Sequence, residues 1–207
     1  MGLGAITLLA AVGVAPPLVE VIRLEPTVRL DIRYATARNF VGRPVYPVAR
    51  ALLLQPVAQA LVRVHRGLEP RGYGLVVFDA YRPWSVTRLF WEAVPPDKRR
   101  FVAPPSRGSN HNRACAVDVS LFERAGGTEV VMPSDYDEMS ERASPRYTGG
   151  DAAARARRDL LRAAMEAEGF GVDHGEWWHF NHRSCPDHPV LDVPLDGPFA
   201  DAPPALR

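Results

Sequence analysis

The sequence predicts a single α+β domain with a central, largely antiparallel sheet flanked by helices. Its 207 residues are about the length of one domain. Hydrophobic residues make up 46% of the chain and charged residues 24%, which is ordinary for a protein that buries a core. Stretches with strand and helix periodicity follow one another in mixed order. A parallel sheet would instead show regular alternation of strand and helix, so the order favours the α+β class.

The first 24 residues are expected to form a lead-in segment. Residues 3–15 form an apolar run, two prolines follow, and no charged side chain precedes Glu20. The run is too short to span a membrane but suits the apolar part of a signal peptide. No Lys or Arg precedes it, however, and a proline would follow the cut after Ala15. Export to the periplasm or cell envelope is therefore one hypothesis, and a cytoplasmic protein with an N-terminal strand or loose tail is the alternative.

The first half of the domain contains two predicted strands and the helix between them. Residues 28–33 alternate between apolar and polar side chains, as in a half-buried strand. Pro56 suits a first helical turn, and the apolar residues after it recur at helical spacing, so a helix is expected over 56–68. Residues 75–78 are all apolar, which predicts a buried strand that ends at Asp79.

The second half begins with a helix predicted over residues 84–94, which two prolines end. Residues 103–113 are rich in Pro, Ser, Gly and Asn and are expected to be loop. Residues 116–121 alternate again and predict a strand. A strong helix pattern covers residues 152–168, with Gly169 as the C-terminal cap.

The C-terminal part combines aromatic and loop-forming residues. Residues 170–180 are rich in aromatics and glycine, which indicates a turn followed by a strand. Residues 196–207 are rich in Pro, Asp and Ala and are expected to be a loose tail.

Charge and cysteine content exclude several functions. Lys and Arg total 25 against 24 for Asp and Glu, a formal charge of +1. This balance gives no basic excess for binding nucleic acid, and no stretch is long enough for a stable membrane span. The two cysteines, Cys115 and Cys185, are too few for a disulfide framework or a Cys-rich zinc site.

Two short segments carry the residues that predict chemistry. In the first, His111 lies on a polar loop and Asp118 lies within an apolar strand, where a carboxylate is costly to bury unless it is paired or bound to metal. In the second, Glu176 and His179 flank two tryptophans. Two imidazoles, one carboxylate and an open fourth position make a catalytic zinc set. A nearby carboxylate that does not bind the metal would then serve as general base.

Each of these residues also has an ordinary structural interpretation. A loop histidine is usually solvated, an aspartate in a strand often caps backbone donors, and paired tryptophans usually lie in the core. The spacing raises a difficulty as well, because residues i and i+3 of a regular strand face opposite sides. If Glu176 and His179 face one metal, Glu176 must lie in the turn after Gly175, or a bulge must intervene.

At these residues the sequence resembles the D-alanyl-D-alanine dipeptidase (VanX-type) family of zinc peptidases, relatives of the VanY-type D,D-carboxypeptidases. The resemblance covers roughly residues 25–195, with the matching stretches in family order. No single stretch is decisive, but together they are highly specific. They are Tyr34-Ala35-Thr36, Asn39-Phe40 with Gly42, Asp79 to Pro83, Ser109 with His111 through Asp118, Met132 to Asp137, Ser140 to Arg142, and Glu176 to Phe180.

The resemblance implies a zinc dipeptidase domain over residues 25–195, with one Zn²⁺ per chain and a small D-amino-acid dipeptide as substrate. The implied function is hydrolysis of D-alanyl-D-alanine or a close analogue. A D,D-carboxypeptidase that trims peptidoglycan stem peptides is the alternative, and a non-catalytic module that binds wall fragments is a second one. The implied roles are zinc binding for His111, Asp118 and His179, general base for Glu176, oxyanion stabilisation for Arg82, and binding of the substrate's ammonium group for Ser109 and Asp137.

The chain departs from the family pattern at Ala114, where the family has glycine. If this position needs a positive φ, alanine would strain the loop.

Cys115 is expected to be an inert, buried residue. Pairing with Cys185 in an exported protein, and a role as an extra metal ligand, are the alternatives. His182 is a rival metal ligand for which a surface position is expected. The oligomeric state is left open by the sequence.

Overall fold

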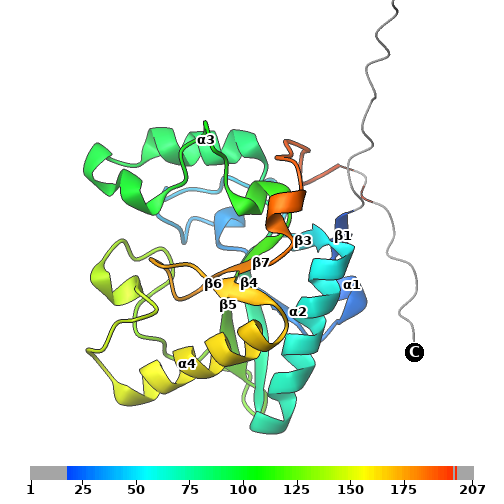
Figure 1. Cartoon of the computed structure of the whole chain (residues 1–207), viewed down its shortest axis with the longest axis vertical. Coiled ribbons are helices and arrows are strands. Elements are labelled where there is room, and N and C mark those ends of the chain that lie inside the picture. Colours follow the sequence, from blue (N-terminus) through cyan, green and yellow to red (C-terminus); the bar gives the residue numbers. More distant parts are fainter. Residues whose placement is uncertain (1–17, 198, 200–207) are drawn as a thin grey trace, which may run out of the picture.

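A five-stranded sheet runs through the middle of the protein in the order β2-β4-β5-β7-β6 (Figure 1). The computed structural model describes residues 18–197 and 199. Its strands are β1 (Leu18–Glu20), β2 (Arg29–Leu30), β3 (Leu52–Leu54), β4 (Tyr73–Asp79), β5 (Ala116–Glu123), β6 (Phe170–Val172) and β7 (His179–His182). Its α-helices are α1 (Val21–Leu24), α2 (Gln55–Leu68), α3 (Trp84–Ala93) and α4 (Ala152–Ala167).

Three of the four pairings in this sheet are antiparallel. Only β2 pairs in parallel, with β4, while β4 with β5, β5 with β7, and β6 with β7 are antiparallel. A separate two-stranded sheet joins β1 to β3. The predicted α+β class with a largely antiparallel sheet is therefore confirmed.

The two central strands bring two acidic residues to one end of the sheet. β4 and β5 are buried along almost their whole length, as their apolar side chains require. Their register is regular from Tyr73 opposite Glu123 to Val77 opposite Val119. A shift then intervenes, and Asp79 lies opposite Asp118. The functional site described below is built around this end.

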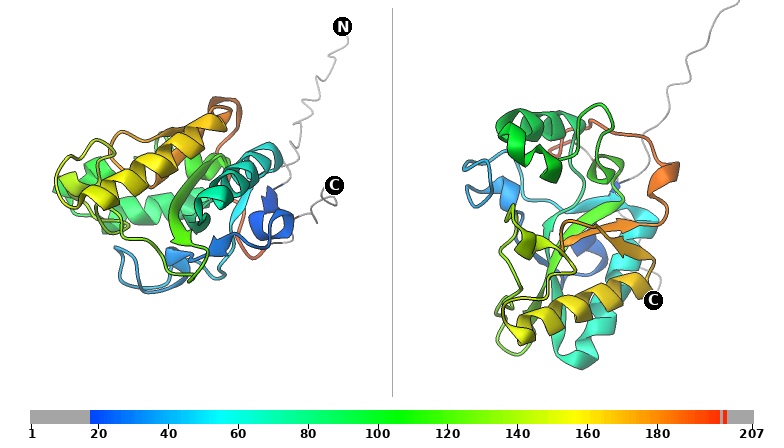
Figure 2. Two further views of the ribbon diagram at one scale, coloured as in Figure 1. Left: turned by 90° about the horizontal axis from the view of Figure 1, so that it is seen from below. Right: turned by 60° about the vertical axis from the view of Figure 1, so that its left-hand side comes forward.

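Helices α2 and α4 pack against each other and against the sheet (Figure 2). Pro56 lies in the first turn of α2, as predicted. The side chain of Asp151 caps α4 by accepting from the backbone N–H groups of Ala153 and Ala154. Gly169 follows the helix with φ of +87°, so the predicted cap is found there. Figure 1 shows α3 at the other end of the molecule from α4.

Several predicted elements are shorter or more divided than expected. The strand predicted over 28–33 is reduced to β2, and a 3-10 turn covers Arg33–Ala35. The predicted loop 103–113 contains a 3-10 turn at Asn110–Arg113. The stretch 170–180 holds all of β6 and the start of β7.

Parts of both predicted end segments contact the domain. Residues 18–24 form β1 and α1, where Leu18, Val19 and Val21 are buried. Two residues of the predicted C-terminal tail contact Arg50: its guanidinium donates to the carbonyl of Gly197 and stacks over the ring of Phe199. The apolar run at residues 3–15 lies outside the described residues.

Among the described residues, no helix combines the length and apolar character that crossing a membrane requires.

Candidate metal centre and active site

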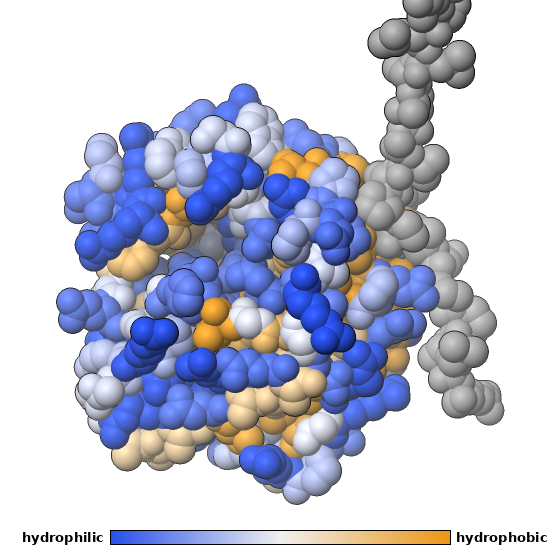
Figure 3. All heavy atoms as spheres, in the orientation of Figure 1, coloured by the Kyte–Doolittle hydropathy of each residue, from blue (hydrophilic) through white to orange (hydrophobic). Residues whose placement is uncertain are grey.

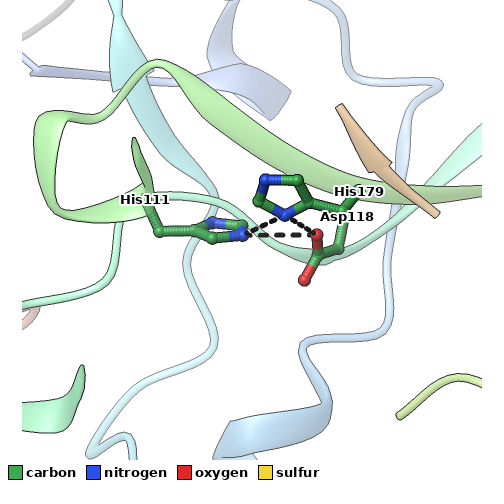
Figure 4. Close-up of side chains that lie close together, drawn as sticks. All are labelled: His111, Asp118 and His179. Carbon is green, nitrogen blue, oxygen red and sulfur yellow. Dashed lines mark hydrogen bonds and ion pairs between the residues drawn. The ribbon is translucent and has the colours of Figure 1, made fainter. Parts of the chain in front are cut away.

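Three potential ligand atoms converge at one end of the central strands (Figure 4). His111 Nε2 lies 3.0 Å from His179 Nδ1 and 3.2 Å from Asp118 Oδ1. His179 Nδ1 lies 3.0 Å from the same Oδ1. The residues predicted as zinc ligands are therefore brought together, although 68 positions separate the two histidines.

Local structure explains how these side chains reach one point. Asp118 in β5 lies directly opposite His179, the first residue of β7. His111 lies in the Asn110–Arg113 turn, which the side chain of Ser109 caps by accepting from the His111 N–H. The side-chain oxygen of Asn112 accepts in return from the Ser109 N–H, which completes a capping box.

Hydrogen bonds on the side of each imidazole ring that faces away from the ligand cluster show which ring nitrogen carries the proton. His111 Nδ1 lies 2.6 Å from the carbonyl oxygen of Ala80, and His179 Nε2 lies 3.0 Å from the side-chain oxygen of Asn181. Both oxygens can only accept, so each ring carries its proton on that outer nitrogen. The inner nitrogens, His111 Nε2 and His179 Nδ1, then present lone pairs to each other and to the Asp118 carboxylate.

Three acceptors that face one another at 3.0–3.2 Å need a cation between them. The residues fit zinc: with bonds of about 2.0–2.1 Å, the edges of a zinc tetrahedron are about 3.3 Å long. Without a metal, a proton takes this place. Burial lowers the pKa of His179, but Asp118 outweighs burial and raises it to about 9.

Asp118 is supported on its other oxygen as well, because the Tyr136 hydroxyl donates to Oδ2 over 2.9 Å. Burial would raise the pKa of Asp118, but the neighbouring His111 and His179 hold it well below its usual range. The carboxylate is therefore ionised and oriented before any metal binds. Outer contacts of this kind raise the basicity of ligands and fix their geometry.

Glu176 lies in the turn between Gly175 and β7, as the strand geometry required if it faces the same site as His179. The backbone N–H of His179 donates to the Glu176 carbonyl over 3.3 Å, which closes the turn. Burial raises the pKa of the Glu176 carboxyl to about 8. The group can therefore exchange a proton near neutral pH, which suits a general base.

Arg82 is fixed by a buried carboxylate. Its Nε and Nη2 both donate to Asp79 Oδ2, over 3.0 and 2.7 Å. The guanidinium carbon lies 4.8 Å from the ring centre of Phe90 and 5.4 Å from that of Tyr34. Its third nitrogen, Nη1, makes no hydrogen bond to any residue in the described part of the chain, so it is available to a ligand.

Asp137 provides an acidic group with unused hydrogen-bonding capacity. Tyr34 donates to its Oδ1 over 2.9 Å, while Oδ2 is buried without a partner among the described residues. Burial raises the pKa of Asp137 to about 7. Its φ of +63° lies in the left-handed region, which aspartate adopts more readily than most residues other than glycine. Ser109 also lies on the cavity wall, with one lone pair used by the turn.

All seven predicted site residues line one cavity of about 460 Å³. Aromatic and apolar side chains from other segments, among them Phe40, Phe101 and Met139, complete its wall. Figure 3 shows the molecule hollowed on this face, below α3. The size is within the range of sites for small molecules.

Ala114, where the family has glycine, adopts the positive φ that was expected to strain the loop. Ala114 adopts φ of +54° and ψ of +32°, the left-handed conformation, and its side chain is fully buried. This conformation costs about 1–2 kcal/mol for an L-residue. The surrounding contacts hold the residue there, including the bond from Leu54 N–H to the Ala114 carbonyl.

The structure differs from the expectations for Cys115 and His182. Cys115 is not a free core residue: it forms a disulfide with Cys185, and their Cα atoms are 5.3 Å apart. Sequence position alone could not show this closeness. His182, the rival ligand, is buried rather than at the surface, and its Nδ1 contacts Ser184 Oγ instead of the ligand cluster.

Comparison with known proteins gives a consistent result. The model of the peptidase M15 family, described as D-ala-D-ala dipeptidase, matches residues 15–196. The chain belongs to this family. It is therefore a metallopeptidase of the dipeptidase type, and M15 peptidases are in general zinc-dependent.

Similar relatives are D-alanyl-D-alanine dipeptidases. That of Escherichia coli is 33% identical, over 84% of this chain and 89% of its own length. That of Enterococcus faecalis is 37% identical, over 74% and 85%. That of Enterococcus faecium is 32% identical, over 81% and 93%. Among solved structures, the LD-carboxypeptidase LdcB aligns with 66% of this chain and 63% of its own at 15% identity, with a TM-score of 0.41.

Sequence reasoning missed the residues that hold the predicted ones in place. Asp79 ends an apolar strand, so the argument applied to Asp118 would have found it as a buried carboxylate in need of a partner. Tyr34 and Tyr136 carried no such signal, because nothing in the sequence tells which carboxylate a tyrosine hydroxyl reaches.

We predict that Asp137→Asn stabilises the zinc-free protein at pH 8 but not at pH 4. Because the pKa of Asp137 is raised to about 7, the folded chain binds more protons than the unfolded chain between about pH 4 and 7. Stability therefore falls as pH rises through this window. Asparagine removes the charge and tolerates the left-handed backbone.

Thermal unfolding at both pH values checks this prediction, with a gain of at least about 2–4 °C expected at pH 8, or about 1 kcal/mol. The exposed neighbour Asp135 provides the control variant, Asp135→Asn. An equal gain for Asp137→Asn at both pH values would contradict the buried charge as its cause.

Proposed function

We propose that this protein is a zinc-dependent dipeptidase that hydrolyses D-alanyl-D-alanine, or a closely related dipeptide, to free amino acids. The observation that carries the proposal is the convergence of three potential ligand atoms in the cavity that also holds Glu176 and Arg82. Membership of the M15 family and the names of its relatives support the substrate class.

His111, Asp118 and His179 would hold the metal. When bound, a zinc ion supplies Lewis acidity, which polarises the scissile carbonyl and lowers the pKa of water. Glu176 would take the proton from the attacking water and deliver it to the leaving amine. Burial raises the pKa of Glu176 to about 8 in the metal-free site, and a cation bound nearby would lower that pKa and leave the carboxylate ionised to accept the proton.

Arg82 would stabilise negative charge on the carbonyl oxygen in the transition state. Asp79 anchors its Nε and Nη2, and Phe90 and Tyr34 restrict the plane of the guanidinium. A donor that is already oriented costs no reorganisation during the reaction.

Asp137 would receive the free ammonium group of the substrate. Its Oδ2 has no hydrogen-bond partner among the described residues, and the Tyr34 hydroxyl orients the carboxyl group through Oδ1. An ammonium group would lower the pKa of Asp137 again and provide the missing donor. Ser109, on the same cavity wall, would use its second lone pair for the same group.

We predict that the purified protein binds about one zinc ion per chain and that His179→Ala removes it. Three protein ligands and an open fourth position make a catalytic zinc site, and loss of one ligand leaves too few. Elemental analysis after dialysis measures the metal. His182→Ala is the matched control, because its ring lies three positions away and outside the cluster. Zinc retained in the His179 variant but lost in the His182 variant would overturn the ligand assignment.

We predict that Glu176→Gln keeps zinc but loses activity on D-alanyl-D-alanine by a factor of at least about 10²–10⁴. Glutamine matches the shape of glutamate and cannot accept the proton of the attacking water. Release of D-alanine, measured beside zinc content and thermal stability, tests this role. Activity within about tenfold of the parent would mean that the base lies elsewhere.

We predict that D-alanyl-D-alanine is cut at least about a thousandfold better than the same bond at the end of a pentapeptide. A longer peptide has an uncharged amide where the dipeptide has its ammonium, and Asp137 would remain buried and unpaired. The values of kcat/KM for the two substrates measure the preference.

Asp137→Asn should narrow that gap by weakening cleavage of the dipeptide. A preference for the pentapeptide would instead identify a D,D-carboxypeptidase. Binding of both substrates without any cleavage would favour a wall-fragment binding module.

We further propose that the protein is exported to the periplasm or cell envelope. Its Cys115–Cys185 disulfide supports this, because disulfides persist in oxidising compartments and are rare in the cytosol. The apolar run at residues 3–15 is compatible with a signal peptide. Mass spectrometry of the protein from its native host should find a chain that begins after Ala15. An intact Met1 in the cytosolic fraction would contradict export.

A further inference from the structure

We infer that the Cys115–Cys185 disulfide is a positioning device for the metal centre, which fixes the register of the two strands that carry Asp118 and His179. The inference rests on the zinc-dependent function proposed above. It adds a role for two residues that take no part in the chemistry, and the role concerns metal affinity rather than the peptidase step.

The strand pairing that joins these two ligands is short. β5 and β7 form three residue pairs, from Ala116 opposite Asn181 to Asp118 opposite His179. One backbone hydrogen bond extends this register at the ligand end, from the Val119 N–H to the Trp178 carbonyl over 3.0 Å. The ligands form the last pair of this ladder. Because side chains alternate between the faces of a sheet, a slip of one residue would turn His179 away from Asp118 and His111.

The disulfide lies at the other end of the same ladder. Cys115 immediately precedes Ala116, and its carbonyl accepts from the backbone N–H of His182, the last residue of β7, over 2.9 Å. Cys185 follows β7 by three residues and begins the 3-10 turn Cys185–Asp187. The covalent bond therefore ties the start of the β5 segment to the chain just after β7.

The outer neighbour of β7 cannot fix the register alone. β6 is a three-residue edge strand that contains Gly171, and it pairs with β7 over only three residues. Gly171 contributes no side chain to the packing of the strand. The covalent link is thus a further constraint on where β7 lies along β5, in addition to the burial of Phe180.

The disulfide also lies next to a strained backbone segment. Ala114, next to Cys115, has φ of +54°, and His111 lies three residues before it. A buried disulfide beside this turn holds Cys115 in place, so relaxation of the strain cannot move the turn freely. All three ligands are therefore close in sequence to a residue of the disulfide, at separations of three to six positions.

The sulfur atoms do not contact the substrate cavity. Neither cysteine lines it, and both side chains are buried, with Cys115 fully so. Limited access protects the bond from thiol exchange, which suits a permanent constraint. Any effect on catalysis must therefore pass through the metal ligands.

A site fixed in advance binds its ligand more tightly, because the ordering has already been done in the free protein. Loss of contacts that orient metal ligands typically lowers metal affinity about 10–100-fold. We expect a loss of this size for the variant Cys115→Ala/Cys185→Ala.

The test compares the zinc dissociation constant of this double variant with that of the parent, by competition with a chelator of known affinity. Leu161→Ala is the matched control: Leu161 lies fully buried in α4 and does not line the cavity, so its truncation lowers stability without removing a ligand or the disulfide. The thermal midpoint of each protein is measured with and without zinc.

The expected result is a 10–100-fold weaker affinity for zinc in the double variant and near-parental affinity in Leu161→Ala. The zinc-dependent rise in midpoint should shrink only in the double variant. Equal zinc affinity in the double variant and the control would overturn the inference and leave the disulfide a general stabiliser.

If the double variant does not fold, the zinc-loaded parent is treated with a phosphine reductant just below its unfolding midpoint. A phosphine is used because dithiols bind zinc themselves. Titration of free thiols follows reduction of the bond. Zinc release that accompanies reduction, ahead of the loss of circular dichroism, supports the inference, and zinc retained by a folded chain whose bond is reduced refutes it. Weakened zinc binding in a protein without dipeptidase activity would sink the proposed function but not this inference.

Discussion

The placement of Asp118 opposite His179, across β5 and β7, is the constraint on which the rest of the site depends. With the strands in this register, the two proposed ligands meet at one point, and the turn that carries His111 has only to bring the third to them. The burial of β5 supports this arrangement, since its neighbouring valines anchor the strand in the core while Asp118 faces the cavity. A carboxylate in such a strand would be destabilising alone, and the two histidines give it opposite charge when a proton or a metal is present.

Around this pair, buried polar groups satisfy one another in a continuous network. The Ala80 carbonyl orients His111, Asn181 orients His179, and Tyr136 orients Asp118. Asp79 does the same for Arg82. Each partner bonds one side of a functional group and leaves another atom of that group free for a metal or a ligand. The network therefore sets protonation states as well as positions, which is what a pre-organised site requires.

The sequence predicted the residue types of the site better than their surroundings. His111, Asp118, Glu176 and His179 stand out because charged groups in apolar or aromatic stretches need a reason to be there. Strand geometry left two places for Glu176, the turn after Gly175 or a bulge, and the structure has it in the turn. The disulfide did not, because pairing depends on a Cα separation of 5.3 Å between residues 70 positions apart.

The sequence predicted the long elements of the fold better than the short ones. The long helices and central strands have strong periodicity, whereas the pattern at residues 28–33 could not tell how few of them would find a partner strand. The short pairing of β1 with β3 has no periodic signal at all, since each strand is only three residues long.

The cavity wall is divided between two kinds of chain segment. The proposed metal ligands come from the central sheet and the turn beside it, while Phe40, Phe101 and Met139 come from connecting segments that carry no ligand. Connecting segments accept insertions and substitutions far more readily than packed strands. Substitutions in these segments can therefore reshape the cavity wall while the strands that carry the proposed ligands stay the same. A protein built in this way can acquire a new substrate range through changes in its loops alone.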